Sequence, residues 1–205
     1  MVYKQYYFKG GLIIVLDLER QKERFKDHVA TLTDYGNIKI LDFQKPGSFE
    51  YRIRFLFEED YYRLHISGDL GELIAMNYTN MTFNGFTDFV NNTGYFKEKI
   101  ICHSRAIYYY NHDLAIEELT ERLLRDYSSD IDIDEVDDLV DDILYDYSDK
   151  TGIGNIGYEK LSEIDPDAFE WAGDVGKEPT GILDLYMLAF KLAKEQLNYS
   201  EVIDR

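Results

Sequence analysis

The net negative charge of this 205-residue chain comes entirely from its second half. Residues 1–110 carry 14 Lys and Arg against 14 Asp and Glu, whereas residues 111–205 carry 8 against 26, which accounts for the formal net charge of −18. Residues 126–149 hold eleven carboxylates and no Lys or Arg. Self-repulsion of this kind weakens a compact state, so the pattern indicates either a face suited to solubility or a surface directed at a positively charged partner. The second is our working hypothesis.

Composition excludes several classes of protein. With 45% hydrophobic and 15% aromatic residues the chain can build a core, so it is not a disordered acidic tail. The single Cys102 excludes an internal disulfide and suits a reducing compartment. No signal peptide and no apolar run of about 18 residues is present. We therefore expect no membrane association and a cytoplasmic location.

The first half has the periodicity of strands. Residues 51–57 alternate with period two and place Arg52 and Arg54 on one face, and residues 38–43 and 61–66 read as neighbouring strands of a hairpin or meander. Residues 73–76 fit a strand or a short helix. We also expect strands over 28–33 and 106–110, and helices over 18–25, 82–90 and 95–101.

The second half changes to helical periodicity. We expect a helix from Asp113 to residue 127, a helix capped by Asp134, a short helix near 158–164 and a last helix from about 179 to 198. The predicted fold class is α+β, with an antiparallel sheet in the N-terminal half packed by helices of the C-terminal half and an exposed acidic helix. The expected organisation is a strand-rich sheet subdomain (1–110) and an acidic helical subdomain (111–205) that packs on it as one compact domain.

The acidic helix is the main candidate site. A solvated helix face usually mixes charges of opposite sign at i,i+4, but pairs such as Asp137/Asp141 and Asp138/Asp142 are like-charged and cost stability. Aspartate is also a poorer helix former than glutamate, so solubility alone does not explain the choice. Tyr127, Tyr145 and Tyr147 lie beside these aspartates and could stack on arginines of a partner. The predicted partner-binding residues are Tyr145 and the aspartates Asp126, Asp130, Asp132, Asp134, Asp137, Asp138, Asp141, Asp142 and Asp146. One alternative is a plain solvated face. Another is a divalent-cation site, since the spacing of Asp130, Asp132 and Asp134 resembles the start of an EF-hand loop, although Glu135 stands where that loop has glycine.

Catalytic and metal-binding patterns are weak. The candidates for a nucleophile and base are His65, Cys102, His103 and His112. Adjacent residues of an extended chain point to opposite faces, which separates Cys102 from His103, so His65 with Cys102 or with His103 would be the better pair. No pair has zinc-ligand spacing. Residues 152–157 match G-x-G-x-x-G but follow no strand of a parallel unit, so we interpret them as a loop. We expect no metal and no cofactor.

Three stretches carry a resemblance: residues 51–55 with 65–71, residues 93–105, and the closing residues 189–197. They resemble small accessory proteins of phages, plasmids and conjugative elements of Gram-positive bacteria, some of which are anti-CRISPR proteins that inhibit the type II RNA-guided nuclease. The resemblance extends over most of the chain and transfers no functional residue. It implies a partner with a positively charged nucleic-acid channel.

Charge and resemblance together predict an inhibitor of a type II CRISPR nuclease, with or without its guide RNA, acting as an acidic DNA mimic. Direct DNA binding is not expected, because affinity for phosphates comes mainly from Lys and Arg. One alternative is a nuclease or hydrolase acting on RNA, which uses His65 with Cys102 or His103, or metal-bound carboxylates such as Asp138 and Asp142. Another is a regulatory protein of a mobile element that binds a basic partner. Arg52, Arg54 and Arg63 present a face whose role stays open.

Overall fold

The computed structural model describes residues 3–8, 11–16, 18–129 and 131–203. Two compact units make up the chain. The sheet unit consists of Met1–Lys4, Val15–Ile107 and Gly181–Arg205, and the acidic unit consists of Gln5–Ile14 and Tyr108–Thr180. The division differs from the expected split at residue 110, because the last helix belongs to the sheet unit and an N-terminal segment belongs to the acidic unit.

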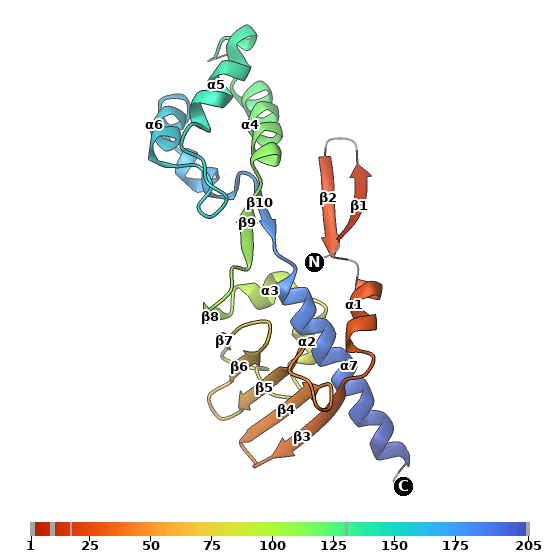
Figure 1. The fold of residues 1–205 in the computed structure, drawn as a ribbon. Coiled ribbons are helices and arrows are strands. Elements are labelled where there is room, and N and C mark those ends of the chain that lie inside the picture. The colour runs from red at the N-terminus through yellow and green to blue at the C-terminus, as the bar shows by residue number, and fades with distance from the viewer. Residues whose placement is uncertain (1–2, 9–10, 17, 130, 204–205) are drawn as a thin grey trace. The chain divides into compact units, whose positions relative to one another are not determined.

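The sheet unit is built on six antiparallel strands that pair in chain order (Figure 1). Side chains alternate along each strand, so Ile53, Phe55 and Phe57 are buried while Arg54 is exposed on the opposite face. Short turns connect most of the strands, which is the simplest way to join antiparallel neighbours. The strands are β3 (Val29–Asp34), β4 (Ile38–Gln44), β5 (Ile53–Glu58), β6 (Arg63–Gly68), β7 (Leu73–Met76) and β8 (Ile100–His103).

Helices pack on the buried face of this sheet: α1 (Leu18–Phe25), α2 (Thr87–Val90), α3 (Thr93–Lys97) and α7 (Ile182–Ile203). Phe55 and Phe57 of β5 meet Phe86 and Phe190, with ring centroids 5.5 to 6.4 Å apart. Each buried phenylalanine contributes about 1.5–3 kcal/mol of hydrophobic free energy. The last helix therefore provides much of the cover of the sheet.

The acidic unit has a separate hydrophobic core, formed by residues such as Leu119, Val140 and Leu161. Its helices are α4 (His112–Asp126), η1 (Ile133–Glu135), α5 (Val136–Ile143), α6 (Asn155–Ile164), η2 (Ala168–Glu170) and η3 (Ala172–Asp174). Strands β9 (Tyr108–Tyr110) and β10 (Lys177–Pro179) pair antiparallel, and β1 (Tyr3–Phe8) and β2 (Gly11–Leu16) form a two-stranded sheet.

The predicted α+β class is confirmed: an antiparallel sheet in the N-terminal half and helices in the C-terminal half. The helix expected over 95–101 is wrong at its end, since residues from Ile100 pair with β7 as an edge strand. The strand expected over 106–110 is present as β9, but it pairs with β10 and not with the six-stranded sheet. Both differences arise because these segments pair with strands that are distant in the sequence, which local periodicity does not reveal.

Several helix boundaries also differ from those expected from the sequence. The cap of α4 is Asn111, whose side chain accepts hydrogen bonds from the backbone N–H groups of Asp113 and Leu114, so Asp113 is not the cap. Asp134 lies in η1, and the residue that precedes α5 is Glu135. The last helix starts at Ile182, because Pro179 still belongs to β10. The helix expected over 82–90 shortens to α2.

No helix in the described ranges combines the length and the apolar character needed to cross a bilayer.

Candidate partner-binding surface

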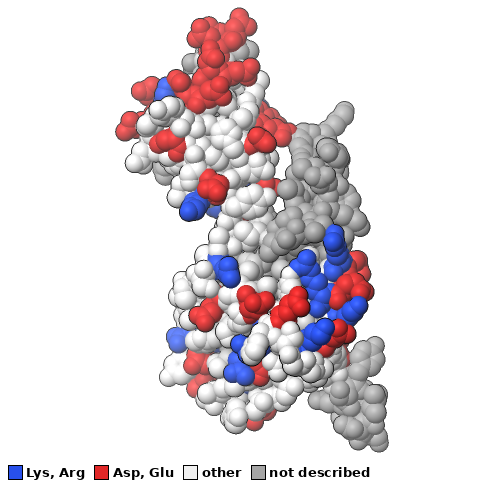
Figure 2. Space-filling view, in the orientation of Figure 1, with Lys and Arg blue, Asp and Glu red and all other residues white. Residues whose placement is uncertain are grey.

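The acidic surface is centred on α5, whose sequence separates apolar from acidic positions. Val136, Val140 and Ile143 are at most 8% exposed and belong to the core of the acidic unit. Four of the positions between them are exposed aspartates, namely Asp137, Asp138, Asp141 and Asp142. Figure 2 shows Asp and Glu gathered over the end of this unit where α5 lies. The helix is thus held by its apolar side and displays carboxylates on the other.

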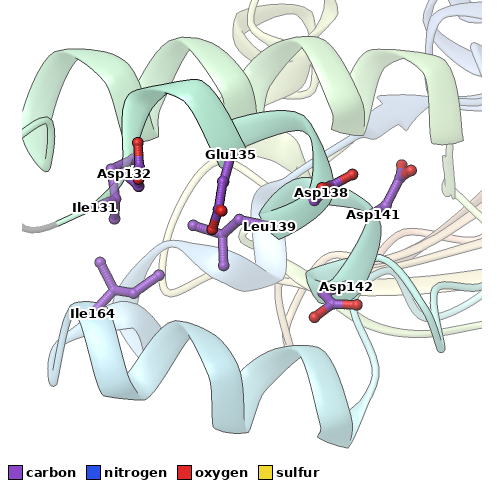
Figure 3. A pocket seen from close by; sticks show the side chains of 8 residues that line it. All are labelled: Ile131, Asp132, Glu135, Asp138, Leu139, Asp141, Asp142 and Ile164. Carbon is purple, nitrogen blue, oxygen red and sulfur yellow. The ribbon is translucent and has the colours of Figure 1, made fainter.

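An open hollow of about 530 Å³ lies beside α5 (Figure 3). Three apolar side chains from different segments line it, those of Ile131, Leu139 and Ile164. Five carboxylates complete the lining: Asp132, Glu135, Asp138, Asp141 and Asp142. The chemistry of the hollow is therefore an apolar base inside an anionic border, which suits a cationic side chain with an apolar stem.

Most of the exposed carboxylates on α5 and just before it lack a cationic neighbour among the described residues. Asp134, Asp137, Asp138 and Asp141 are exposed and form no ion pair with a Lys or Arg of the described chain. The exception on α5 is Asp142, which accepts a hydrogen bond from Lys160 of α6. The negative field over the rest of α5 is not neutralised by the described residues around it.

Two other residues of the predicted set, Asp126 and Asp146, accept hydrogen bonds from within the protein. The Asp126 carboxylate accepts hydrogen bonds from the guanidinium of Arg125, 2.8 and 2.9 Å away, and this bond lowers the pKa of Asp126. Arg122 is a second cation, 3.9 Å from Asp126. Asp126 is consequently less available to a partner than the aspartates of α5. Asp130 lies outside the described residues.

Asp146 serves the fold. Its carboxylate accepts hydrogen bonds from the backbone N–H groups of Ile156 and Gly157, at 3.0 and 3.2 Å, in the first turn of α6. A Cβ at Gly154 would lie 2.2 Å from the same carboxylate, which explains the glycine. The loop over 152–157 therefore holds a protein carboxylate where a phosphate loop would hold a phosphate. Asp146 is partly buried and is removed from the partner-binding set on this geometry.

Of the three tyrosines expected to stack, only Tyr145 is free to do so, with 79% of its surface exposed. The Tyr127 hydroxyl donates a 2.5 Å hydrogen bond to Asp165. The Tyr147 hydroxyl donates to the carbonyl of Asn111, and burial raises the Tyr147 pKa. Both of these rings are held by the core of the acidic unit.

The structure does not bring the catalytic candidates together. His65 and Cys102 both flank Ile74 on neighbouring strands, so they are two strand spacings apart, about 10 Å. His65 Nε2 is 3.0 Å from a carboxylate oxygen of Glu58. His103 lies opposite Leu73 and contacts the carbonyl of Arg105 through Nδ1, at 2.7 Å. No nucleophile and base are paired among these residues.

Within the described residues no group of three or more His, Cys, Asp or Glu has the arrangement of a metal site. Metal-bound Asp138 and Asp142, the other enzymatic alternative, have no support from this geometry.

The arginines of the sheet are largely engaged. Arg54 forms two hydrogen bonds with Asp42 on the neighbouring strand, at 2.7 and 2.9 Å, and these bonds raise the Arg54 pKa. Arg63 is 3.7 Å from Glu58. The Arg52 guanidinium lies over the Phe49 ring, 5.0 Å from its centroid. This face is therefore a mixed, mostly internally paired surface.

Two residues important to the acidic surface were missed from sequence. Glu135 borders the hollow, and its position three residues from Asp132 and Asp138 was a usable helical signal. Lys160, which neutralises Asp142, is 18 residues away along the chain and had no such signal.

A scan against protein-family models, a search of curated proteins and a search of solved structures each give no match.

Proposed function

We propose that this protein is a non-enzymatic inhibitor that occupies the basic nucleic-acid channel of a nucleic-acid-handling protein through the acidic surface of α5. The observation that carries the proposal is the set of exposed, unpaired carboxylates Asp134, Asp137, Asp138 and Asp141. Their repulsion is a cost to folding, and a cationic partner would remove it. A cationic partner would therefore account for the concentration of aspartates on α5.

The spacing of the charges supports a nucleic-acid mimic. From residue 134 to residue 142 there are six carboxylates, and at about 1.5 Å per residue this segment is about 13 Å long. The density is about one charge per 2 Å, close to the value of about one per 1.7 Å for duplex DNA. Lys160 lowers this density only at Asp142.

The partner proposed first is a type II RNA-guided nuclease, because the chain resembles accessory proteins of mobile elements, some of which are anti-CRISPR proteins. Such a nuclease holds its heteroduplex in a positively charged channel. The exposed Tyr145 ring beside α5 would stack on a channel arginine. A regulatory protein of a mobile element with a different basic partner would use the same surface and differs only in the identity of that partner. An RNA-cleaving enzyme gains no support from the separation of His65 and Cys102.

The test compares two variants that remove equal charge. The first is the triple substitution Asp137→Asn, Asp138→Asn and Asp141→Asn on α5. The control is Glu50→Gln, Glu72→Gln and Glu98→Gln, which removes three exposed carboxylates from the sheet unit. Affinity for the guide-loaded nuclease is measured by titration at several salt concentrations, with unfolding curves as a check of the fold.

We expect the α5 variant to lose at least about tenfold in affinity and to show a shallower salt dependence, while the control keeps most of the wild-type affinity. Equal losses in the two variants would mean that only total charge matters. Unchanged affinity of the α5 variant, or no competition with target DNA, would remove the proposed function.

A further inference from the structure

The sheet unit carries a second exposed feature, formed by residues other than the acidic ones of α5. In an antiparallel meander every second connection lies at the same end of the sheet. The loops over residues 35–37, 59–62 and 77–80 follow β3, β5 and β7, so all three lie at one end. Each loop contributes at least one exposed tyrosine.

These tyrosines are Tyr35, Tyr61, Tyr62 and Tyr78, which together we name the tyrosine edge. Their exposed fractions are 68%, 66%, 38% and 91%, so three of the four side chains are mostly exposed to solvent and Tyr62 is partly exposed. Tyrosine provides a large contact area with few rotatable bonds, and for this reason it is frequent in protein recognition surfaces. Four such rings on neighbouring loops exceed the scattered exposure that needs no explanation.

The loops that carry the rings are bonded to one another. The backbone N–H of Glu59 donates to the carbonyl of Asn37 at 2.7 Å, and the Asn37 side chain donates to the Asp60 carboxylate at 2.9 Å. The backbone N–H of Asn77 donates to the carbonyl of Tyr62 at 3.1 Å. Because these bonds hold the loops before any partner arrives, less conformational entropy is lost on binding.

The backbone of Tyr62 supports the same conclusion. Its φ is +47°, in the left-handed region that residues other than glycine rarely adopt. Such a conformation costs free energy and persists where the surrounding structure imposes it. The ring of Tyr62 is thus presented by a turn of defined geometry.

The charge around the rings selects the kind of ligand. Residues 34–39, 58–63 and 77–80 hold four carboxylates and two cations, which is a formal charge of −2. Asp60 is exposed, and its contact with Asn37 leaves its charge in place. Stacking on nucleic-acid bases would need a positive groove for the phosphates, and this charge opposes it. A cationic ligand with a planar group fits both the rings and the carboxylates.

The molecule already shows the contact on a small scale. The guanidinium of Arg63 lies over the Tyr61 ring, 5.9 Å from the ring centroid. Arginine is favoured over lysine in such contacts because its planar group stacks and is weakly hydrated. A partner's arginines would meet more rings of the same kind at this end of the sheet.

We propose that the tyrosine edge is a second interaction surface, which binds arginine side chains of an extended cationic segment in a protein partner. The rings would hold the guanidinium planes, and the exposed Asp60 carboxylate would accept hydrogen bonds from them. This surface lies in the sheet unit and does not depend on the function proposed for α5.

The probe for the test is a hexapeptide of alternating glycine and arginine, added to protein with isotope-labelled tyrosine rings. Matched probes are the same peptide with lysine in place of arginine and a short oligothymidylate. We expect saturable shifts of the ring signals of the tyrosine edge with the arginine peptide, at least about threefold weaker binding of the lysine peptide, and no shift with the oligonucleotide. Absent shifts, equal binding of the two peptides, or shifts caused by the oligonucleotide would each overturn the proposal.

Substitutions give a second measurement. The double variant Tyr35→Ser and Tyr78→Ser removes two exposed rings and should weaken binding of the arginine peptide to the remaining rings about 5- to 10-fold. Phe169→Ser in the acidic unit also removes an exposed ring, so it is the matched control and should leave binding to the tyrosine edge unchanged. Unfolding temperatures equal to that of the wild type show that the fold is kept. Unaltered binding by the double variant contradicts the proposal.

Discussion

His28 shows at the scale of one residue how burial controls a titratable group. The side chain is 3% exposed and packs against the rings of Phe25 and Phe43, each with its centroid 5.1 Å away. Its Nε2 lies 3.2 Å from the carbonyl of Tyr51, which can only accept, so Nε2 carries the proton. Its Nδ1 is buried and has no hydrogen-bond partner in the structure. The site therefore holds a neutral imidazole.

This environment predicts loss of stability in mild acid. Burial lowers the pKa of His28, and Lys45 lowers it further, against the opposing effects of Glu50 and Asp27. Since the unfolded chain binds the proton more readily, the free energy of unfolding should fall as the pH drops through about 6.5 and below. His28→Gln should flatten this dependence, measured by denaturant unfolding between pH 8 and pH 5. The control is His103→Gln on the exposed edge strand, which should keep the wild-type pH profile.

At the scale of the element, α5 is held by tertiary packing and opposed by its own charges. It is eight residues long, too short to be stable alone in water, where isolated helices need about 12–15 residues. Asp141 lies in its last turn, near the negative end of the helix dipole and four residues after Asp137. Asp142 has the same position relative to the dipole, but Lys160 compensates it. The two neighbouring aspartates should thus differ in their effect on stability.

We predict that Asp141→Asn raises the free energy of unfolding by about 0.3–0.5 kcal/mol at low salt, and that the gain shrinks in high salt. Asp142→Asn is the matched control. It loses the contact with Lys160, a surface pair worth about 0–1 kcal/mol, and so should give no gain. Denaturant unfolding of the three proteins checks this. A loss of stability in Asp141→Asn would show that an unrecognised cation binds there.

At the scale of the whole molecule, the chain leaves the sheet unit after Ile107 and returns to it at Gly181. The strands at these two crossings pair, with Tyr108 opposite Pro179, so the crossings are about 5 Å apart. The residues between them have their own hydrophobic core. The larger part of the acidic unit is in this sense an insertion between β8 and α7.

A deletion tests this organisation. Replacing residues 108–180 by a linker of about four glycines and serines should leave a sheet unit that unfolds cooperatively, because α7 stays in place over the sheet. A chain that ends at Tyr110 should not fold, since it loses α7 and exposes Phe55, Phe57 and their neighbours. Thermal unfolding followed by circular dichroism distinguishes the two. Folding of the shorter chain, or failure of the linked one, would contradict the assignment of α7 to the sheet unit.

Local pattern was sufficient for much of the fold. The alternation in Ile53–Glu58 and the apolar spacing in α5 each identify an element and its buried face from neighbouring residues. The helix Leu18–Phe25 agrees with the expected range, because its polar, helix-favouring residues are contiguous. Ile100–His103 shows the limit, since its strand conformation depends on pairing with β7 and not on its own residues.

Consecutive residues are enough to predict the kind of surface, a short amphipathic helix with an acidic face, since period and charge are properties of neighbouring residues. Which of these carboxylates are free depends on contacts between distant parts of the chain. Asp146 is held by the first turn of α6 and Asp142 by Lys160, whereas Asp137 and Asp141 keep an uncompensated charge. The physical reason is that a charge is compensated by whatever the fold brings within hydrogen-bonding distance, and those partners come from residues distant in the chain.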